Sequence, residues 1–190
     1  MSQAGRTRVV VMLGLAQTLA WASCFYLPAI LASQMAASLG LAASTPYALL
    51  SMALLVSAMV SPWAGRRIDL HGGRPVLLLA TLIFAAGLAL LALAQGLASL
   101  VLAWLVLGLA MGLGLYDAAF ATLVHLYGRH ARQPITGVTL LAGFASTVGW
   151  PLSSWMQAQM GWRGACLGWA LLHILLALPL YAALPRRATV

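Results

Sequence analysis

The chain has 190 residues, of which 63% are hydrophobic and only 6% are charged, and its formal net charge is +8. Its mean hydropathy of +0.98 excludes the polar surface of a water-soluble protein, and a lipid bilayer is the environment that fits it. The apolar runs are continuous and lack the alternation of a transmembrane barrel, so the predicted fold is an all-α polytopic membrane protein.

The apolar runs predict six transmembrane helices in a single domain over residues 1-190, because one helix needs about 20 apolar residues to cross a bilayer. The expected spans are 9-31, 45-64, 75-95, 98-126, 135-157 and 164-184. An uncharged loop at 32-44 follows the first span, and a tight turn around Gln95 and Gly96 joins the third to the fourth. Prolines inside or near the ends of spans predict bends at Pro28, Pro62, Pro151 and Pro179. Two others suit the first turn of a helix, namely Pro75 and Pro134.

All ten basic residues are arginines, and their positions predict the orientation of the chain in the membrane. With a cytoplasmic N-terminus, nine arginines fall in cytoplasmic segments and only Arg163 lies outside. This distribution follows the positive-inside rule, and it places both termini in the cytoplasm of a cell with the chain in the inner (plasma) membrane. The net charge then indicates contact with anionic lipid headgroups, and no nucleic-acid partner is expected.

The N-terminal segment has features of a signal peptide, because two arginines precede an apolar run that reaches Cys24. Trp21 stands where a lipid-attachment site has a small aliphatic residue, and the run continues to about Leu31, so we expect a retained first helix. Cys24 and Cys166 fall inside spans and are expected to pack as small apolar residues. No metal site and no cofactor are expected.

Glycines in the fourth span predict a close contact between helices. Gly108 and Gly112 form a G-x-x-x-G pair, and Gly114 widens the same groove. A groove of this kind lets the backbone of another helix approach closely.

The stretch GRRIDLHGGRP, residues 65 to 75, connects the second span to the third and holds four of the twelve charged residues, ten basic plus two acidic. Gly65 can end the second span, and the Gly72-Gly73 pair suits a tight turn. Asp69 can pair with the arginines or accept hydrogen bonds from a helix N-terminus. Cytoplasmic anchoring explains the arginines, but it does not explain an acidic residue and two glycines at this spacing.

This stretch resembles the loop signature of the major facilitator superfamily, G-x-x-x-D-(R/K)-x-G-(R/K)-(R/K), which joins the second and third helices. The matching residues are Gly65, Asp69, Gly72 and Arg74. Leu70 and Gly73 occupy positions that are usually basic. Three further segments are similar to spans four to six of bacterial members: LYDAAFATLVHLYG (115-128), GFASTVGWPLSSW (143-155) and GWRG (161-164).

The resemblance implies a polytopic secondary transporter that moves a small solute by alternating access, with the loop acting in a conformational latch. Family members usually have twelve spans in two related halves, so the chain corresponds to the N-terminal six-helix half of the fold. The implied partners are a small solute, membrane lipids and a second six-helix half, in the same or another chain, which Asp69 would contact. Trp104 stands where many proton-coupled members carry an arginine, and GWPLSS departs from the antiporter signature, so neither coupling mode is inferred.

Asp117 is the only acidic residue inside a predicted span, and an ionisable group there costs at least about 2.5 kcal/mol on insertion scales. It is therefore a candidate for substrate contact. The resemblance places span four beside the central cavity, where Tyr116 and Phe120 could form an aromatic wall. Two other interpretations stay open: a structural hydrogen-bond partner for a polar neighbour, or an acid that desolvation keeps protonated.

Polar and aromatic side chains recur at spacings of three and four residues in two spans, which places them on one helix face. Span one carries Gln17, Trp21 and Cys24, and span five carries Thr147, Trp150, Ser154 and Gln157. Such a stripe can line a water-filled path or mediate helix packing. We expect a lining role for span five, and both roles stay open for span one.

His173, near the middle of span six, is expected to be a hydrogen-bonded packing residue, and Arg163 to cap the start of that span. Two other functions are considered. A truncated, non-transporting membrane module would act through a partner. An intramembrane serine protease would need Ser146 in GFASTVG to pair with His173. That stretch lacks the required following glycine, so no catalytic residue is predicted and the chain is not expected to be an enzyme.

Overall fold

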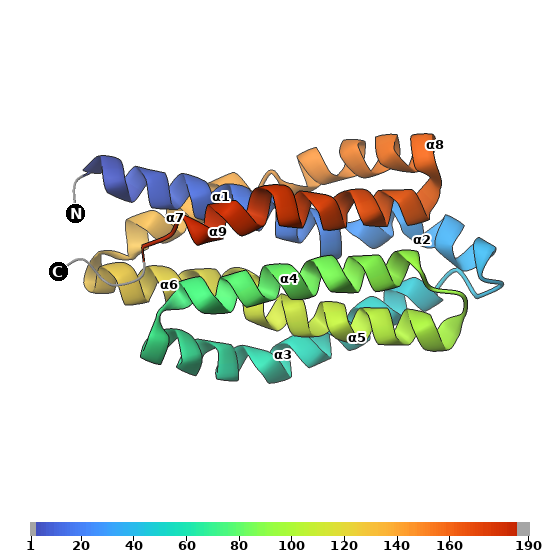
Figure 1. Cartoon of the computed structure of the whole chain (residues 1–190), viewed down its shortest axis with the longest axis horizontal. Coiled ribbons are helices and arrows are strands. Elements are labelled where there is room, and N and C mark those ends of the chain that lie inside the picture. Colours follow the sequence, from blue (N-terminus) through green and yellow to red (C-terminus); the bar gives the residue numbers. More distant parts are fainter. Residues whose placement is uncertain (1–2, 186–190) are drawn as a thin grey trace.

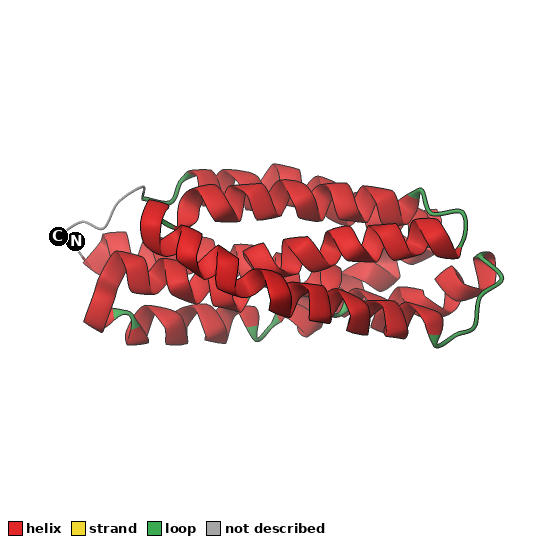
Figure 2. Ribbon diagram, turned by 90° about the horizontal axis from the view of Figure 1, so that it is seen from below, coloured by secondary structure: helices red, strands yellow, loops and turns green. Residues whose placement is uncertain are grey.

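The computed structural model describes residues 3–185, and all regular elements in this part of the chain are helices (Figure 1, Figure 2). Five segments of it are long and apolar enough to cross a membrane: Gln3–Ser38, Thr45–His71, Gly73–Ala92, Leu97–His130 and Arg132–Ala182. The all-α prediction is therefore confirmed. The last segment has 51 residues, about twice the length that a single crossing requires.

The first crossing segment consists of two helices, α1 (Gln3–Cys24) and α2 (Leu27–Ser38), which meet at Phe25 and Tyr26. Pro28 lies in the first turn of α2, where its missing N–H is tolerated. The predicted loop at 32-44 is too long, because α2 continues to Ser38. The reason is that the side chains of Leu31 and Met35 are buried and extend the packed face of α2.

The second segment is one helix, α3 (Thr45–His71), and the third is α4 (Gly73–Ala92). The prediction that Gly65 ends the second span is wrong, because the helix continues beyond it and buries Ile68 on its inner face. The turn occurs at Gly72, whose φ of 82° lies in the region that favours glycine. The predicted turn at Gln95 and Gly96 is confirmed, and the Ser99 hydroxyl accepts hydrogen bonds from both backbone N–H groups.

The fourth segment is interrupted, which the sequence did not indicate. Helix α5 (Leu97–Gly114) and helix α6 (Tyr116–Tyr127) are separated by Leu115, whose backbone is extended. A 3₁₀ turn, η1 (Gly128–His130), follows α6.

The last segment begins with α7 (Arg132–Ala142) and α8 (Ala145–Leu172) and ends with a π-helical turn, η2 (His173–Ala177), and α9 (Leu178–Ala182). Helix α8 reverses direction at Gly161, where φ is 70° and ψ is 175°. Trp169 Nε1 donates a hydrogen bond of 3.0 Å to Ser153 Oγ. Sixteen residues of straight helix span about 24 Å, so this bond requires the two limbs of α8 to run side by side.

Two glycines of α5 allow a close contact with α3. A Cβ atom at Gly108 would lie 2.7 Å from the carbonyl oxygen of Ala53, and one at Gly112 would lie 2.8 Å from that of Ser57. Helix α5 therefore lies directly against α3, and the close contact predicted from the G-x-x-x-G pair is confirmed.

The arginines are distributed unequally between the two ends of the bundle. One end contains the start of α1, the α3–α4 turn, η1 and the end of α9 (Figure 1). The arginines of this end in the described residues are Arg6, Arg8, Arg66, Arg67, Arg74, Arg129 and Arg132. The other end, with the turns at 39–44, 93–96 and Gly161, carries Arg163 alone among the described residues. Arg186 and Arg187, which belong to the predicted cytoplasmic set, lie outside the described residues.

Candidate functional site

Six aromatic rings from α1, α6, α8 and the α1–α2 break form a continuous row. In order of contact, this aromatic row consists of Phe120, Tyr116, Trp21, Phe25, Tyr26 and Trp150. Phe120 and Tyr116 are stacked with ring centroids 5.0 Å apart, and Tyr116 lies 4.8 Å from Trp21. Centroid distances of this size are typical of attractive ring pairs. The row joins elements that are far apart in the sequence.

The aromatic row brings together four of the residues singled out in the sequence, from three different spans: Trp21, Tyr116, Phe120 and Trp150. It also contains two residues that the sequence reasoning missed, Phe25 and Tyr26. They were missed because they occupy the break between α1 and α2, within what the hydropathy pattern presents as one continuous span. Their position two and three residues before Pro28 was the available signal.

Helix α1 is linked to the α5–α6 break by the buried side chain of Gln17. Its Nε2 atom donates a hydrogen bond of 2.6 Å to the carbonyl oxygen of Gly114, the last residue of α5, and one of 3.2 Å to the hydroxyl of Tyr181. Gln17 was a candidate for the substrate cavity. Its side chain is completely buried, so it supports the segment that carries Tyr116 and is not itself exposed to a solute.

Two more polar side chains of α1 form hydrogen bonds with residues at or beside irregular turns of other helices. The Thr18 hydroxyl donates to the carbonyl oxygen of Leu141, next to the α7–α8 break, at 3.2 Å. Ser23 Oγ lies 2.8 Å from Nε2 of His173, the first residue of the π-helical turn. The His173 ring also stacks on Phe84 at 4.9 Å. The prediction of a hydrogen-bonded packing histidine is confirmed. The hydrogen-bond partner of His173 is Ser23, whereas the protease hypothesis requires Ser146.

Asp117 lies in the first turn of α6, between the two α6 members of the aromatic row. Its side chain is exposed, and it makes no hydrogen bond or ion pair with any of residues 3–185. A structural hydrogen bond from Asp117 to a polar neighbour is therefore not found among these residues. Phe120 lies three residues after Asp117, a spacing that makes the two residues neighbours on the helix surface.

The stripe of span five is exposed on α8. Thr147, Trp150 and Ser154 are exposed and Gln157 is half-buried, with no hydrogen bond from these four side chains to residues 3–185. Trp150 connects the stripe to the aromatic row through Tyr26, with ring centroids 6.3 Å apart. Polar side chains without partners at this depth need water or another polar surface beside them.

The loop residues at the arginine-rich end have different environments. Arg74 Nη1 donates to the carbonyl oxygen of Leu184 at 3.4 Å, which connects the start of α4 to the chain after α9. Asp69 is exposed and bonds to no arginine among residues 3–185, so the predicted pairing is not found there. Gly73 departs from the basic residue of the signature for a physical reason. A Cβ atom there would overlap the Thr122 side chain of α6.

At the opposite end, Arg163 and the two cysteines have structural roles. Arg163 Nη1 donates to the carbonyl oxygen of Ala92 at 2.6 Å and lies over the Trp162 ring at 4.3 Å. It therefore caps the C-terminal end of α4, and the expected cap on the start of span six is corrected accordingly. Cys24 and Cys166 are free and buried, as predicted for packing residues. Among the described residues, no group of three or more His, Cys, Asp or Glu side chains could hold a metal ion.

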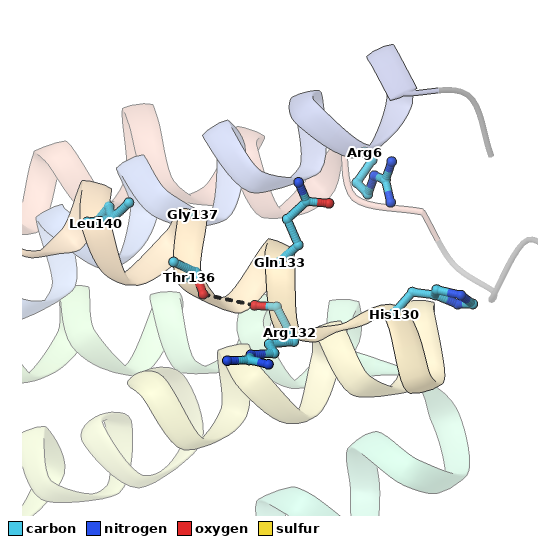
Figure 3. A pocket seen from close by; sticks show the side chains of 7 residues that line it. All are labelled: Arg6, His130, Arg132, Gln133, Thr136, Gly137 and Leu140. Carbon is cyan, nitrogen blue, oxygen red and sulfur yellow. Dashed lines mark hydrogen bonds between the residues drawn. The ribbon is translucent and has the colours of Figure 1, made fainter.

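Two concave surfaces lie away from the aromatic row. A basic pocket of 540 Å³ at the arginine-rich end is shown in Figure 3, where Arg6 extends from α1 and Gln133 extends from α7 into the space between the two helices. Its other lining residues are His130, Arg132, Thr136, Gly137 and Leu140. An apolar groove of 710 Å³ runs along α1, α8 and α9, with Arg8 in its lining. Neither contains a residue of the aromatic row, in which Trp150 is exposed and the other five residues are half-buried.

The sequence comparison identifies one family. The model of the Major Facilitator Superfamily matches residues 13–190 of this chain. No curated protein matches the chain.

Proposed function

Because this chain belongs to the Major Facilitator Superfamily, we propose that it is a secondary transporter that moves a small solute across a membrane by alternating access. The observation that carries this proposal is the aromatic row. It connects three interrupted segments, and it lies at the α1–α2 break and directly after the α5–α6 break. Irregular backbone inside a membrane is tolerated where it is buried in protein or lines a cavity, and discontinuous helices mark substrate sites in transporters.

We further propose that residues 1-190 form a single domain of six crossings, equivalent to the N-terminal half of a twelve-crossing transporter. The reversal of α8 at Gly161 supports the sixth crossing, because it divides the 51-residue segment Arg132–Ala182 into two limbs. The start of α1 and the end of α9 lie at the same end of the bundle (Figure 1), as an even number of crossings requires.

A second six-helix half, in the same or another chain, would cover the open side of the aromatic row. The substrate cavity would then lie between the halves, with Trp21, Tyr116, Asp117, Phe120, Thr147, Trp150 and Ser154 on this side of it. Neither the basic pocket nor the apolar groove contains any of these residues. The latch loop would face the same partner, since the Asp69 carboxylate is exposed and has no partner among residues 3–185.

We place the protein in the inner (plasma) membrane with both termini in the cytoplasm. The excess of arginines at one end of the bundle supports this orientation through the positive-inside rule. The exposed leucines, valines and tryptophans of the bundle surface would contact lipid.

The experiment that tests the proposal is transport by purified chain in liposomes. Proteoliposomes are incubated with a mixture of small metabolites, and the solutes that enter are measured by mass spectrometry against protein-free liposomes. We expect at least one solute to enter with the protein, and Asp69→Asn to slow its entry without reducing the amount of inserted protein. The oligomeric state is measured in the same preparation, and a chain that transports alone should be a dimer.

The alternative is a non-transporting module that acts through a partner. It is favoured if the purified chain is a monomer that binds and transfers no solute. A normal rate of solute entry with Asp69→Asn would be consistent with transport but would reject the latch role of Asp69.

A further inference from the structure

The charge distribution around the aromatic row leaves Asp117 without a counter-charge. Every arginine of the described residues lies near one end of the bundle or the other. Arg163 is bonded to the carbonyl oxygen of Ala92, and Arg74 to that of Leu184. The titratable side chain of His173 is buried behind α1 and bonded to Ser23. Within residues 3–185, no basic side chain is paired with Asp117.

The environment of Asp117 would oppose an anionic solute and favour a cationic one. An anion beside the aromatic row would meet this carboxylate and no compensating positive charge among the described side chains. Exposed carboxylates at membrane depth are costly unless they are paired or hydrated, and a cationic solute beside the aromatic row would supply the missing counter-charge.

The aromatic row supplies the other component of a cation site, beside the Asp117 carboxylate. The face of an aromatic ring carries negative charge density and attracts a cation that lies within about 6 Å of the ring centre. Tyr116 and Phe120, one residue before and three after Asp117, present stacked rings, and Trp21 extends the aromatic surface onto α1. All three residues are only half-buried, so part of each side chain remains accessible.

We propose that the solute of this site is a monovalent organic cation with an apolar or aromatic substituent. Its positive charge lies beside the Asp117 carboxylate and over the Tyr116 ring, and its apolar part lies along Trp21 and the rest of the aromatic row. This inference rests on the proposed function for the location of the site. Its test measures equilibrium binding and does not depend on transport.

The test uses the purified whole chain and radiolabelled tetraphenylphosphonium as the probe, with bound label measured by scintillation proximity. Unlabelled benzyltrimethylammonium is the competitor, and its uncharged carbon analogue, neopentylbenzene, is the matched control. We expect the cation to displace the label and the neutral analogue to leave it bound. Asp117→Asn should weaken probe binding by about tenfold or more, because it removes a charged partner. Asp117→Glu should retain most of the binding.

A second pair of variants tests the aromatic contribution. Tyr116→Leu should weaken binding about threefold to tenfold. Tyr47→Leu should leave it unchanged, because Tyr47 is exposed on α3 and is not a member of the aromatic row. Circular dichroism of each variant establishes that it is folded.

Three results would overturn the inference: no saturable probe binding, equal binding by wild type and Asp117→Asn, or equal displacement by the neutral analogue. The transport experiment separates this failure from failure of the proposed function. Entry of a neutral or anionic solute, with no cation binding, would retain the transporter and reject the cation site. Cation binding that depends on Asp117, in a chain that transfers no solute, would retain the cation site and reject the transporter.

Discussion

Gln17 Nε2 donates a hydrogen bond of 2.6 Å to the carbonyl oxygen of Gly114, across a sequence separation of 97 residues. Gly114 is the last residue of α5, and the extended residue after it interrupts the helix. An interrupted helix leaves backbone groups that cannot be satisfied by water inside a bilayer. The Gln17 amide compensates for the interruption from a neighbouring helix, and it thereby fixes the direction in which α6 carries Tyr116 and Asp117.

Replacing Gln17 should destabilise the protein. Gln17→Leu removes the hydrogen bonds to Gly114 and Tyr181 and leaves two buried polar groups unpaired, at a cost of about 1–2 kcal/mol. Thermal unfolding in detergent measures the loss. Gln34→Leu is the control, because Gln34 is exposed on α2 and its substitution should change stability by less than about 0.5 kcal/mol. Equal midpoints for the two variants would show that the Gln17 link carries no stability.

Ser23 and His173 should be energetically coupled. Ser23→Ala and His173→Phe each remove their 2.8 Å hydrogen bond, and the phenyl ring of the second variant can still stack on Phe84. A double-mutant cycle on unfolding free energy should give a coupling of about 0.5–1.5 kcal/mol. Strictly additive effects would mean that the bond makes no net contribution.

Two glycines should respond to alanine in opposite ways. Gly108→Ala places a Cβ atom 2.7 Å from the Ala53 carbonyl oxygen, so α5 and α3 must separate, at a cost of about 1–3 kcal/mol. Gly65→Ala meets nothing within 4 Å and lies inside α3, where alanine is favoured over glycine by about 0.8–1 kcal/mol. Thermal unfolding of both variants checks this pair. A stabilised Gly108→Ala would contradict the close contact.

Arg163 should matter for stability and not for solute recognition. Arg163→Gln loses the charged hydrogen bond to the C-terminal end of α4 and should reduce stability by about 0.3–1 kcal/mol. Arg163→Lys should recover part of the loss. The apparent affinity for a transported solute should be the same in wild type and Arg163→Gln, and a large fall in affinity would assign Arg163 to the solute path.

The sequence was sufficient for the helical class and for the turn at Gly72. Hydropathy indicates whether a segment can lie in lipid, and the glycine at position 72 indicates a turn because its φ of 82° favours glycine. The α3–α5 contact was also predictable, because the small residues that permit it are separated by one helical turn.

The helix breaks and the aromatic row could not be predicted in the same way. Leu115 is a good helix former, and its extended backbone depends on partners such as Gln17 that lie elsewhere in the chain. Gly65 looked like a helix end, but the burial of Ile68 one turn later extends the helix past it. Phe25 and Tyr26 have no hydropathy signal that distinguishes them from the span on either side, so the aromatic row is visible only once three segments are assembled.

We propose that the exposed polar face of α8 borders a water-filled solute path and does not contact lipid. Thr147 and Leu175 provide a matched pair for testing it. The Trp169–Ser153 hydrogen bond sets the register of the two antiparallel limbs. Thr147 lies six residues before Ser153 and Leu175 lies six residues after Trp169, so both lie on the same side of this hydrogen bond along the bundle. Both are exposed, one on the polar stripe and the other on an apolar surface.

The measurement is the rate at which a charged, membrane-impermeant thiol reagent modifies Thr147→Cys and Leu175→Cys in membranes, in a background with Cys24 and Cys166 replaced by alanine. Only a hydrated thiol ionises and reacts, so Thr147→Cys should react about tenfold faster or more. If both cysteines are equally unreactive, the α8 stripe faces lipid or protein, and the solute path does not lie along it.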